Sequence, residues 1–336
     1  VFRWCLKEFA CNFIPARFRP LAPCRRHDVH DGGRQATTPG MNFIEAKPLV
    51  ALDGLQLDDA ATPTLTLSLS SIHPDLDGCV LDGVLTAKEC AHVVETAERA
   101  GFSFWAPDGP SDEKRRMRNA DTLEFVGTDL CAQLWERIAP FVTARSAISA
   151  DQSRSERDLE GEWAAAGLNE HLLINKYAAG GHFAPHADGS TIETFNRRSL
   201  YTVLLYLNDC AAGGATQILH GEQCESTQSN AQGAAVARDD AVAYAVQPLA
   251  GRVLVYWHQT THAGETVGAG AHKYCVRSDV MFERDPPRCT APNDLKAFDL
   301  YQQARELEAA GQPMEAMMLF RRASKVSQGI KEAYRL

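Results

Sequence analysis

Short apolar runs separated by Gly, Asn, Asp and Pro fill residues 172–282, and they constrain the fold more than any other feature of the sequence. No helical period lies between them, and many short strands in succession predict a β sandwich or barrel. A jelly roll, also called a double-stranded β-helix or cupin-like fold, is the barrel that encloses a small site. We therefore expect a mainly β fold with supporting helices. The runs are 172–177, 199–207, 215–219, 241–246, 252–257 and 274–282.

Two supporting helices are expected before this region. Thr86 and Glu89 have the spacing of a capping box, and apolar residues follow at helical spacing until Gly101. A second helix is expected from about Thr128, with Pro140 near its end. Both patterns are typical of amphipathic helices that pack on a sheet.

Other segments lack a clear period. Residues 62–71 predict one strand, 143–161 a surface loop, and His220–Asp240 a long, mobile connection between strands. The segment 102–120 mixes aromatic residues, turn residues and a basic cluster. It is either a substrate-facing lid or a solvated loop.

After Pro287 the pattern is helical again. We expect Asn293 to cap a helix that runs to Ala310, and Pro313 to begin a second one. This hairpin partly matches a tetratricopeptide unit. Since one such unit cannot bury its own apolar face, it either docks on the barrel or is part of an array that binds a protein partner; an ordinary helical hairpin is the alternative. The matching residues are Gly311, Ala316, Phe320 and Ala323.

A metal site is indicated by His186-x-Asp188 together with His262. Residues i and i+2 on an extended segment point to the same face, so an imidazole nitrogen and a carboxylate oxygen can reach one ion. Two His and one carboxylate with open positions form the facial triad of non-haem Fe(II) oxygenases. A zinc hydrolase with a bound water is the alternative.

Cations near the triad favour the oxygenase reading. Lys273 and Arg277 follow His262 by 11 and 15 residues, and they share a strand face on which the far end of a dicarboxylate would need a cation. Tyr206 can add a hydroxyl donor. A zinc hydrolase has no need for such an anchor.

Other histidines could be mistaken for ligands. His182 and His258 each precede a proposed ligand by four residues, which on a strand is about 13 Å, too far to share one metal. We expect both to lie behind the ligands or on the surface. His272 is expected to be a solvated residue at a strand end.

Composition excludes several classes of function. The formal net charge of −9 and the pI near 5.7 argue against nonspecific electrostatic binding to nucleic acid or to anionic lipid. No run of about 18 apolar residues is present, so no membrane span is expected. The ten cysteines show no Cys-x-x-Cys spacing, which favours free thiols of an intracellular protein over a disulfide framework.

The first 40 residues are basic and poor in acids, and Met41 follows them. They are interpreted either as an organelle-targeting extension or as sequence upstream of the true start. Disorder is expected in both cases. The compartment of the protein is not determined by these features.

From about Asp82 to Arg284, the chain resembles the prolyl 4-hydroxylase-like branch of the Fe(II)/2-oxoglutarate dioxygenases. Each motif is weak alone, but their order and spacing are specific. The motifs are Tyr177-x-x-Gly-Gly-x-Phe-x-Pro-His-x-Asp188, Tyr206-Leu-Asn, Gly213-Gly-Ala-Thr, Pro248-x-x-Gly251, and His262 with Val267, Gly270 and Lys273.

The resemblance implies that His186, Asp188 and His262 hold Fe(II), and that Lys273 pairs with the distal carboxylate of 2-oxoglutarate (2OG), helped by Tyr206. Tyr177 would shape the pocket. In the family the cation usually lies ten residues after the distal His, where this chain has His272, so Arg277 is the second candidate. Dioxygen is the other cosubstrate, and ascorbate is a candidate reductant.

The implied activity is hydroxylation of a C–H bond with release of succinate and CO2, with a peptidyl prolyl residue as one candidate acceptor. Alternatives are the same chemistry on a small molecule or another residue, or a catalytically inactive scaffold. The expected domains are a basic extension (1–40), a dioxygenase domain (41–290, with its jelly-roll core at about 165–284) and a helical hairpin (291–336).

Overall fold

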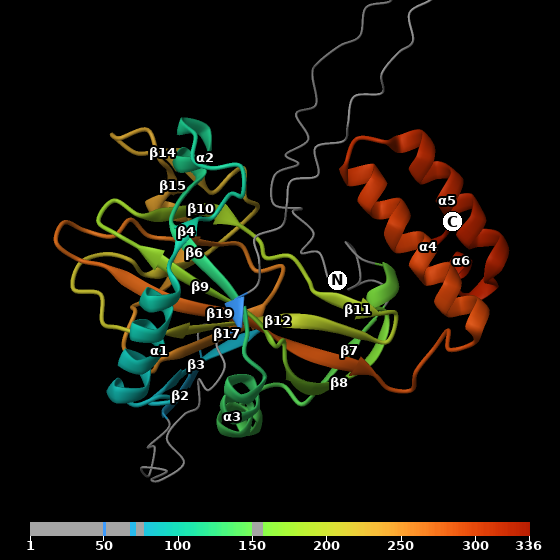
Figure 1. Ribbon diagram of the computed structural model, residues 1–336, viewed down its shortest axis with the longest axis horizontal. Helices are drawn as coiled ribbons and strands as arrows, with labels where there is room; N and C mark the ends of the chain where they lie inside the picture. The colour runs from blue at the N-terminus through green and yellow to red at the C-terminus, as the bar shows by residue number, and fades with distance from the viewer. Residues whose placement is uncertain (1–49, 52–67, 72–76, 150–156) are drawn as a thin grey trace, which may run out of the picture.

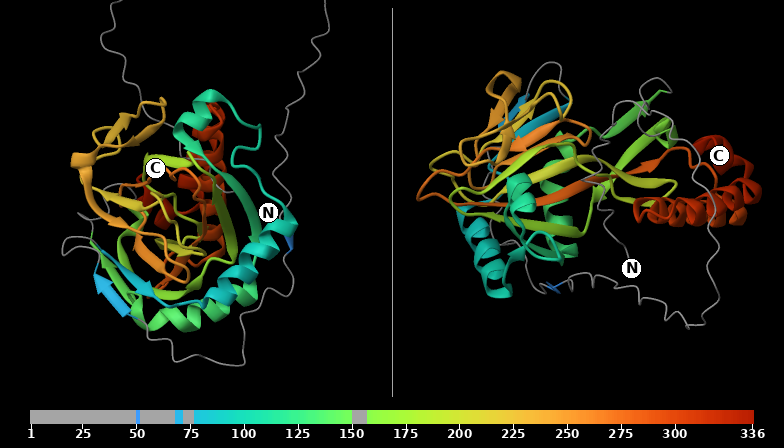
Figure 2. Two further views of the ribbon diagram at one scale, coloured as in Figure 1. Left: turned by 90° about the vertical axis from the view of Figure 1, so that its left-hand side faces the viewer. Right: turned by 90° about the horizontal axis from the view of Figure 1, so that it is seen from above.

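The computed structural model describes residues 50–51, 68–71, 77–149 and 157–336. Two mainly antiparallel sheets face each other as a jelly-roll barrel, with helices along one side and at one end (Figures 1 and 2). The expected mainly β fold is therefore confirmed. The prediction for residues 1–40 and most of that for 62–71 fall outside the described residues.

The larger sheet has the strand order β1-β6-β9-β19-β12-β17-β3-β2 in the described part of the chain, and β4, β7, β8 and β11 pair beside it. Its strands are β1 (Val50–Ala51), β2 (Ser68–Ser71), β3 (Gly78–Asp82), β4 (Ser103–Phe104), β6 (Asp121–Val126), β7 (Arg145–Ile148), β8 (Gly161–Leu168), β9 (His171–Tyr177), β11 (Ile192–Thr194), β12 (Arg197–Tyr206), β17 (Val253–Trp257) and β19 (Lys273–Arg284).

The smaller sheet has the order β16-β13-β18-β10-β5, and a separate hairpin, β14-β15, lies beside it. These strands are β5 (Arg118–Asn119), β10 (His182–His186), β13 (Thr216–Leu219), β14 (Thr227–Ser229), β15 (Ala235–Ala237), β16 (Val242–Val246) and β18 (His262–Gly264). The helices are α1 (Ala87–Ala100), α2 (Asp112–Met117), α3 (Thr128–Ile138), α4 (Pro292–Ala309), α5 (Pro313–Val326) and α6 (Gln328–Tyr334), with 3-10 turns η1 (Ala139–Phe141), η2 (Arg157–Leu159) and η3 (Asp239–Ala241).

Strand alternation divides the apolar core into two layers. On β17, Val253 and Val255 pack with helices α1 and α3 outside the barrel, whereas Leu254 and Tyr256 belong to the cluster inside it. Successive side chains of a strand point to opposite faces, so one apolar run fills both layers. Figure 2 shows α1 and α3 along one outer side of the barrel.

The predicted helix signals are present at α1. Thr86 accepts a hydrogen bond from the backbone of Glu89, Glu89 accepts one from Thr86, and the helix ends at Gly101, whose φ is +90°. Gly251, the last residue of the Pro248-x-x-Gly motif, has φ +80°, and a Cβ there would lie 2.0 Å from the carbonyl oxygen of Leu85. A side chain cannot be accommodated at this turn.

Two segments that were expected to be a loop or a connection contain regular structure. The segment 143–161 contains β7, which pairs with β8, and η2. The segment His220–Asp240 contains the β14-β15 hairpin, closed by backbone bonds between Asn230 and both Gly233 and Ala234. Its Ala237 packs with the apolar residues Leu219 and Ala263, which polar composition alone did not reveal.

The first C-terminal helix begins slightly earlier than expected, whereas α5 begins at Pro313 as predicted. Ala291, not Asn293, is the N-cap of α4, because Pro292 at the first position needs no N–H partner and Asp294 accepts the N–H of Ala291. A third helix, α6, was not predicted. None of the described helices is long and apolar enough to cross a membrane.

These helices dock on the barrel. Phe195, between β11 and β12, packs edge-on against Phe298 of α4 and Tyr334 of α6 at centroid distances of 6.0 and 6.1 Å. The Tyr334 hydroxyl also donates to Asp158, which accepts a bond from Arg198 of β12. A single helical unit was expected either to dock on the barrel or to belong to a longer array. The structure shows it docked on the barrel (Figure 1).

We predict that Phe298→Ala lowers the free energy of unfolding by about 3 kcal/mol, because it removes a buried ring from the contact between α4 and the barrel. The matched control is Leu295→Ala on the same helix, where the side chain is 49% exposed and the expected loss is small. Urea denaturation followed by circular dichroism measures both. Equal effects of the two substitutions would contradict docking as a source of stability.

Candidate metal and cosubstrate site

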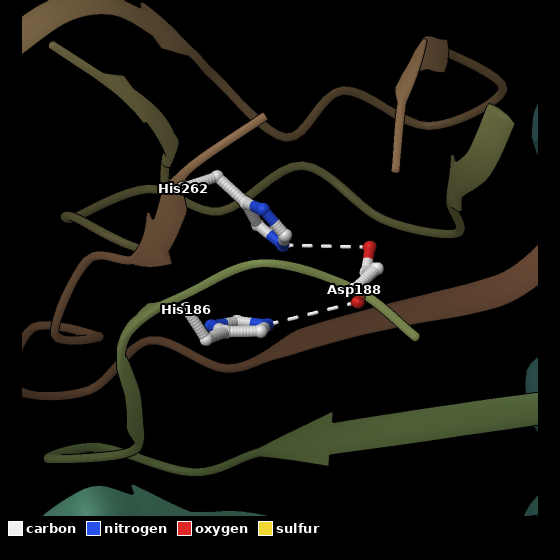
Figure 3. A group of neighbouring side chains, drawn as sticks. All are labelled: His186, Asp188 and His262. Atoms are coloured by element: carbon white, nitrogen blue, oxygen red, sulfur yellow. Dashed lines mark ion pairs between the residues drawn. The ribbon is translucent and has the colours of Figure 1, made fainter. Parts of the chain in front are cut away.

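Three side chains with metal-binding atoms meet inside the barrel. His186 ends β10, Asp188 follows it, and His262 begins β18, the neighbouring antiparallel strand. The Nε2 atoms of His186 and His262 lie 3.8 and 3.6 Å from the two carboxylate oxygens of Asp188 (Figure 3). One ligand atom from each residue lies within 4.8 Å of the others. The structure thus brings together the triad that the sequence indicated.

The donor set fits a divalent metal. Nδ1 of His186 lies 2.8 Å from the carbonyl oxygen of Ala184, and Nδ1 of His262 lies 2.9 Å from that of Thr260. A carbonyl can only accept, so each Nδ1 carries the proton and each Nε2 presents a lone pair. Nε2 of His262 also lies 3.0 Å from the Tyr256 hydroxyl. Burial lowers the pKa of both imidazoles to about 4, which keeps them neutral.

Asp188 is held as a carboxylate. Burial alone would raise its pKa, but the Arg277 guanidinium, the two imidazoles and the Thr202 hydroxyl together hold it well below its usual range. Thr202 Oγ1 donates to Oδ2 at 2.7 Å, and the Tyr256 hydroxyl donates to the same oxygen at 2.8 Å. The charge and orientation of the carboxylate are therefore fixed from two strands.

Behind Thr202 lies His258. Its Nδ1 is 2.8 Å from Thr202 Oγ1, and its Nε2 is 2.7 Å from Ser199 Oγ. The hydroxyl of Thr202 already donates its hydrogen bond to Asp188, so Nδ1 of His258 must be the donor in the bond to Thr202. His258 therefore orients Thr202 rather than binding metal.

The other histidines also lie outside the triad. His182 is buried, with its ring nitrogens 3.2 and 3.0 Å from the carbonyl oxygens of Gly180 and Arg116. The surface alternative considered for His182 and His258 was thus wrong, because both side chains are 3% exposed. His272 is exposed, as expected, and packs against the Tyr274 ring.

The two candidate cosubstrate anchors lie in different surroundings. Lys273 is buried, donates to the carbonyl oxygen of Gly214 at 2.8 Å, and lies 5.4 Å from the ring centroids of both Tyr177 and Tyr206. Burial lowers the pKa of Lys273. Tyr206 donates its hydroxyl proton to Thr216 at 2.7 Å. These residues form one polar corner of the barrel.

Arg277 instead pairs with the carboxylates of Asp188 and Asp279. Its Nε lies 3.5 Å from Asp188 Oδ1, and its NH2 group lies 3.3 Å from Asp279 Oδ1 and 3.2 Å from the carbonyl oxygen of Gly189. Lys273 and Arg277 do share the inner face of β19. Only Arg277, however, is bound to the triad.

Sequence reasoning missed Tyr256 and Thr202. Both are inward-facing residues, and they are direct partners across the β12-β17 pair. Period-2 alternation along β17 puts Tyr256 on the same face as Leu254, so this signal could have identified Tyr256 as inward-facing. The contact with Asp188, however, depends on strand register, which the apolar pattern does not determine.

The buried imidazoles should make metal-free protein unstable in mild acid. Unfolded histidine gains its proton near pH 6.5, whereas His186, His258 and His262 stay neutral in the fold down to about 4. The unfolded state therefore binds more protons in this window, so stability falls as pH drops from about 6.5 to 4, by up to about 1.4 kcal/mol per pH unit for each imidazole. Urea titrations at pH 7, 6 and 5 measure it; a flat profile would contradict the burial of these rings.

Residues 172–278 match the model of the 2OG-Fe(II) oxygenase superfamily. No curated protein sequence is similar enough to the chain to be matched. The matched region contains all three triad residues and Lys273. It does not cover α1, α3 or the C-terminal helices.

Solved structures similar to the chain include three prolyl hydroxylases. A Pseudomonas putida prolyl-4-hydroxylase is 12% identical, with a TM-score of 0.37, over 61% of this chain and 93% of that one. The collagen prolyl hydroxylase of Paramecium Bursaria Chlorella virus-1 is 15% identical, with a TM-score of 0.38, over 64% and 95%. A Trichoplax adhaerens prolyl hydroxylase, solved with a hypoxia inducible factor peptide fragment, is 16% identical, with a TM-score of 0.37, over 63% and 85%.

These low identities and TM-scores say nothing about substrate. The assignment depends on the family match and on the triad inside it. The ligand atoms of His186, Asp188 and His262 lie within 4.8 Å of one another, and their side chains are at most 9% exposed. Residues 172–278, which contain the whole triad, are thus similar to the 2OG-Fe(II) oxygenase superfamily.

Proposed function

We propose that the protein is an Fe(II)- and 2OG-dependent dioxygenase that hydroxylates a C–H bond and releases succinate and CO2. The observation that carries this proposal is the group of His186, Asp188 and His262, whose ligand atoms lie within 4.8 Å of one another and whose side chains are at most 9% exposed. Three protein ligands leave the other positions of a six-coordinate ion for cosubstrate and dioxygen. When bound, the iron supplies the oxidative chemistry that couples 2OG decarboxylation to hydroxylation.

The protein groups around the ion hold and orient it. The carbonyl oxygens of Ala184 and Thr260 fix the tautomers of the two imidazoles, while Thr202 and Tyr256 fix the carboxylate. Such outer contacts tune ligand basicity and geometry in metal sites. Burial of the whole group excludes water from the reaction.

Lys273 is proposed as the partner of the distal carboxylate of 2OG. Among the described residues, its only hydrogen bond goes to the carbonyl oxygen of Gly214, and an ammonium group has three donors. Arg277 is already bound to Asp188 and Asp279. Tyr206 would act through Thr216, because its donation leaves the Thr216 proton free to turn toward the carboxylate.

A peptidyl prolyl residue as acceptor stays a prediction, as do a small molecule and another residue type. The experiment that identifies the acceptor is mass spectrometry of proteins and metabolites from a lysate incubated with enzyme, Fe(II), 2OG and ascorbate. The product will carry one added oxygen. An inactive scaffold is disfavoured because all three metal-binding residues are present and correctly oriented.

Anaerobic Fe(II) and 2OG should together give a weak visible charge-transfer band, because the keto acid chelates the metal. His186→Ala and Asp188→Ala are expected to abolish both the band and succinate formation, since each removes a ligand. His272→Ala, which removes an exposed imidazole outside the group, should retain them. Folded wild-type protein without the band, or unchanged turnover in the ligand variants, would refute the proposed site.

The cosubstrate anchor is tested by comparing Lys273→Ala with Arg277→Ala. Loss of a charge-assisted bond of about 1.5–3 kcal/mol should raise the KM for 2OG roughly 10- to 100-fold in Lys273→Ala. Arg277→Ala should change the Fe(II) requirement more than the 2OG requirement, because Arg277 contacts the metal-binding carboxylate. Succinate assays with varied 2OG and varied Fe(II) measure both; the reverse pattern would make Arg277 the anchor.

A further inference from the structure

Arg118 is a buried cation that projects from the smaller sheet into the barrel. It belongs to β5, which pairs with β10 so that Arg118 lies opposite Phe183, and only 6% of the residue is exposed. Its carbonyl oxygen accepts a bond from Trp105 Nε1 at 2.8 Å. These contacts hold its backbone in place.

The guanidinium has few partners for a buried charge. Its NH2 group donates to Asn175 Oδ1 at 2.5 Å, and this is its only hydrogen bond to the described residues. Its Nε is buried and without an acceptor, and no carboxylate of the described residues pairs with it. Other buried arginines have fuller sets of partners: Arg198 with Asp158, Arg277 with Asp188 and Asp279, and Arg284 with the carbonyl oxygens of Asp158 and Glu160.

This charge lies beside the metal-binding group. The guanidinium carbon is 4.5 Å from the centre of the Phe183 ring, and that ring stacks on His186 at a centroid distance of 3.6 Å. Asn175, its hydrogen-bond partner, is paired on the neighbouring strand with Cys275, which lies between Lys273 and Arg277. An anion bound by Arg118 would therefore lie close to the Phe183 ring that stacks on His186.

We propose that Arg118 binds a carboxylate group of the prime substrate, which makes the acceptor an acidic molecule or an acidic segment. The planar guanidinium matches a carboxylate through paired N–H donors. A buried charge without a counterion is unfavourable. A ligand whose carboxylate pairs with the guanidinium therefore gains affinity and is held in one orientation.

2OG has two carboxylates, and the proposed function uses both, so 2OG is not the natural partner of Arg118. The inference depends on the proposed function, in which one carboxylate of 2OG reaches the metal and the other reaches Lys273. Both carboxylates are then used, and Arg118 is left for a third. Helix α2, which carries both acidic and basic residues, lies against β5 and β10 (Figure 1).

The first test uses acetate as the probe and thermal unfolding as the readout. Protein loaded with Mn(II), which supports no turnover, and saturated with 2OG is heated in sodium acetate and in sodium chloride of equal ionic strength. Acetate is expected to raise Tm of the wild type by about 2–4 °C more than chloride does, because it binds only the folded state. Arg118→Met should abolish this difference.

The same variant separates a ligand-binding arginine from a structural one. In the absence of acetate, Arg118→Met should keep or raise Tm, since it removes an uncompensated charge, whereas Arg198→Met, which leaves Asp158 unpaired, should lower it. If Arg118→Met fails to fold, Arg118→Gln carries the same comparison. A wild type that gains no more from acetate than from chloride, or an acetate effect that persists without Arg118, would overturn the proposal.

Kinetics identifies the source of the carboxylate. Arg118→Met should leave the 2OG requirement of substrate-free succinate formation within about twofold of the wild type, and should lower kcat/KM for the acceptor at least tenfold. A tenfold rise in the KM for 2OG would assign Arg118 to the cosubstrate and overturn the proposal, as would an acceptor without a carboxylate. Wild-type protein that binds no 2OG refutes the proposed function itself, whereas 2OG binding without an acetate effect refutes only the role of Arg118.

Discussion

A buried carboxylate between two neutral imidazoles is the interaction on which the rest of the structure depends. Asp188 must stay charged without water, and this requires donors from the surrounding strands. β12 supplies Thr202, β17 supplies Tyr256 and β19 supplies Arg277. These strands are adjacent in the larger sheet, whereas His186 and His262 come from the smaller one. The site therefore exists only when the two sheets face each other in the correct register.

Much of this architecture was predictable, because apolar runs follow strand periodicity and His186-x-Asp188 is a local pattern. The contacts of Thr202 and Tyr256 were not, since a shift of one residue between strands would turn both side chains away. Arg118 belongs to a basic cluster whose sequence favours a solvated loop. Its burial became apparent only from the pairing of β5 with β10. The β14-β15 hairpin was hidden by its polar composition. Long-range pairing, rather than local preference, separates what was predicted from what was missed.

The C-terminal helices are more than an appendage in the structure. Phe195 and Phe298 share an apolar contact, and Tyr334 bonds with Asp158, which in turn pairs with Arg198. Arg198 also donates to a hydroxyl group two residues after Asp188, that of Ser190. The C-terminal helical unit is thus connected, through side-chain hydrogen bonds, to the segment that carries Asp188.

Strand β19 carries both Lys273 and Arg277, and it is hydrogen-bonded to β9 and β8 on one side and to β12 on the other. Four residues of extended chain separate the two cations, about 13 Å between their α-carbons at ~3.3 Å per residue. Because β19 is paired on both sides over most of its length, the distance between these two α-carbons is fixed. In the proposed enzyme, β19 therefore fixes the backbone position of Lys273, the proposed 2OG anchor, relative to Arg277, which contacts the metal-binding carboxylate.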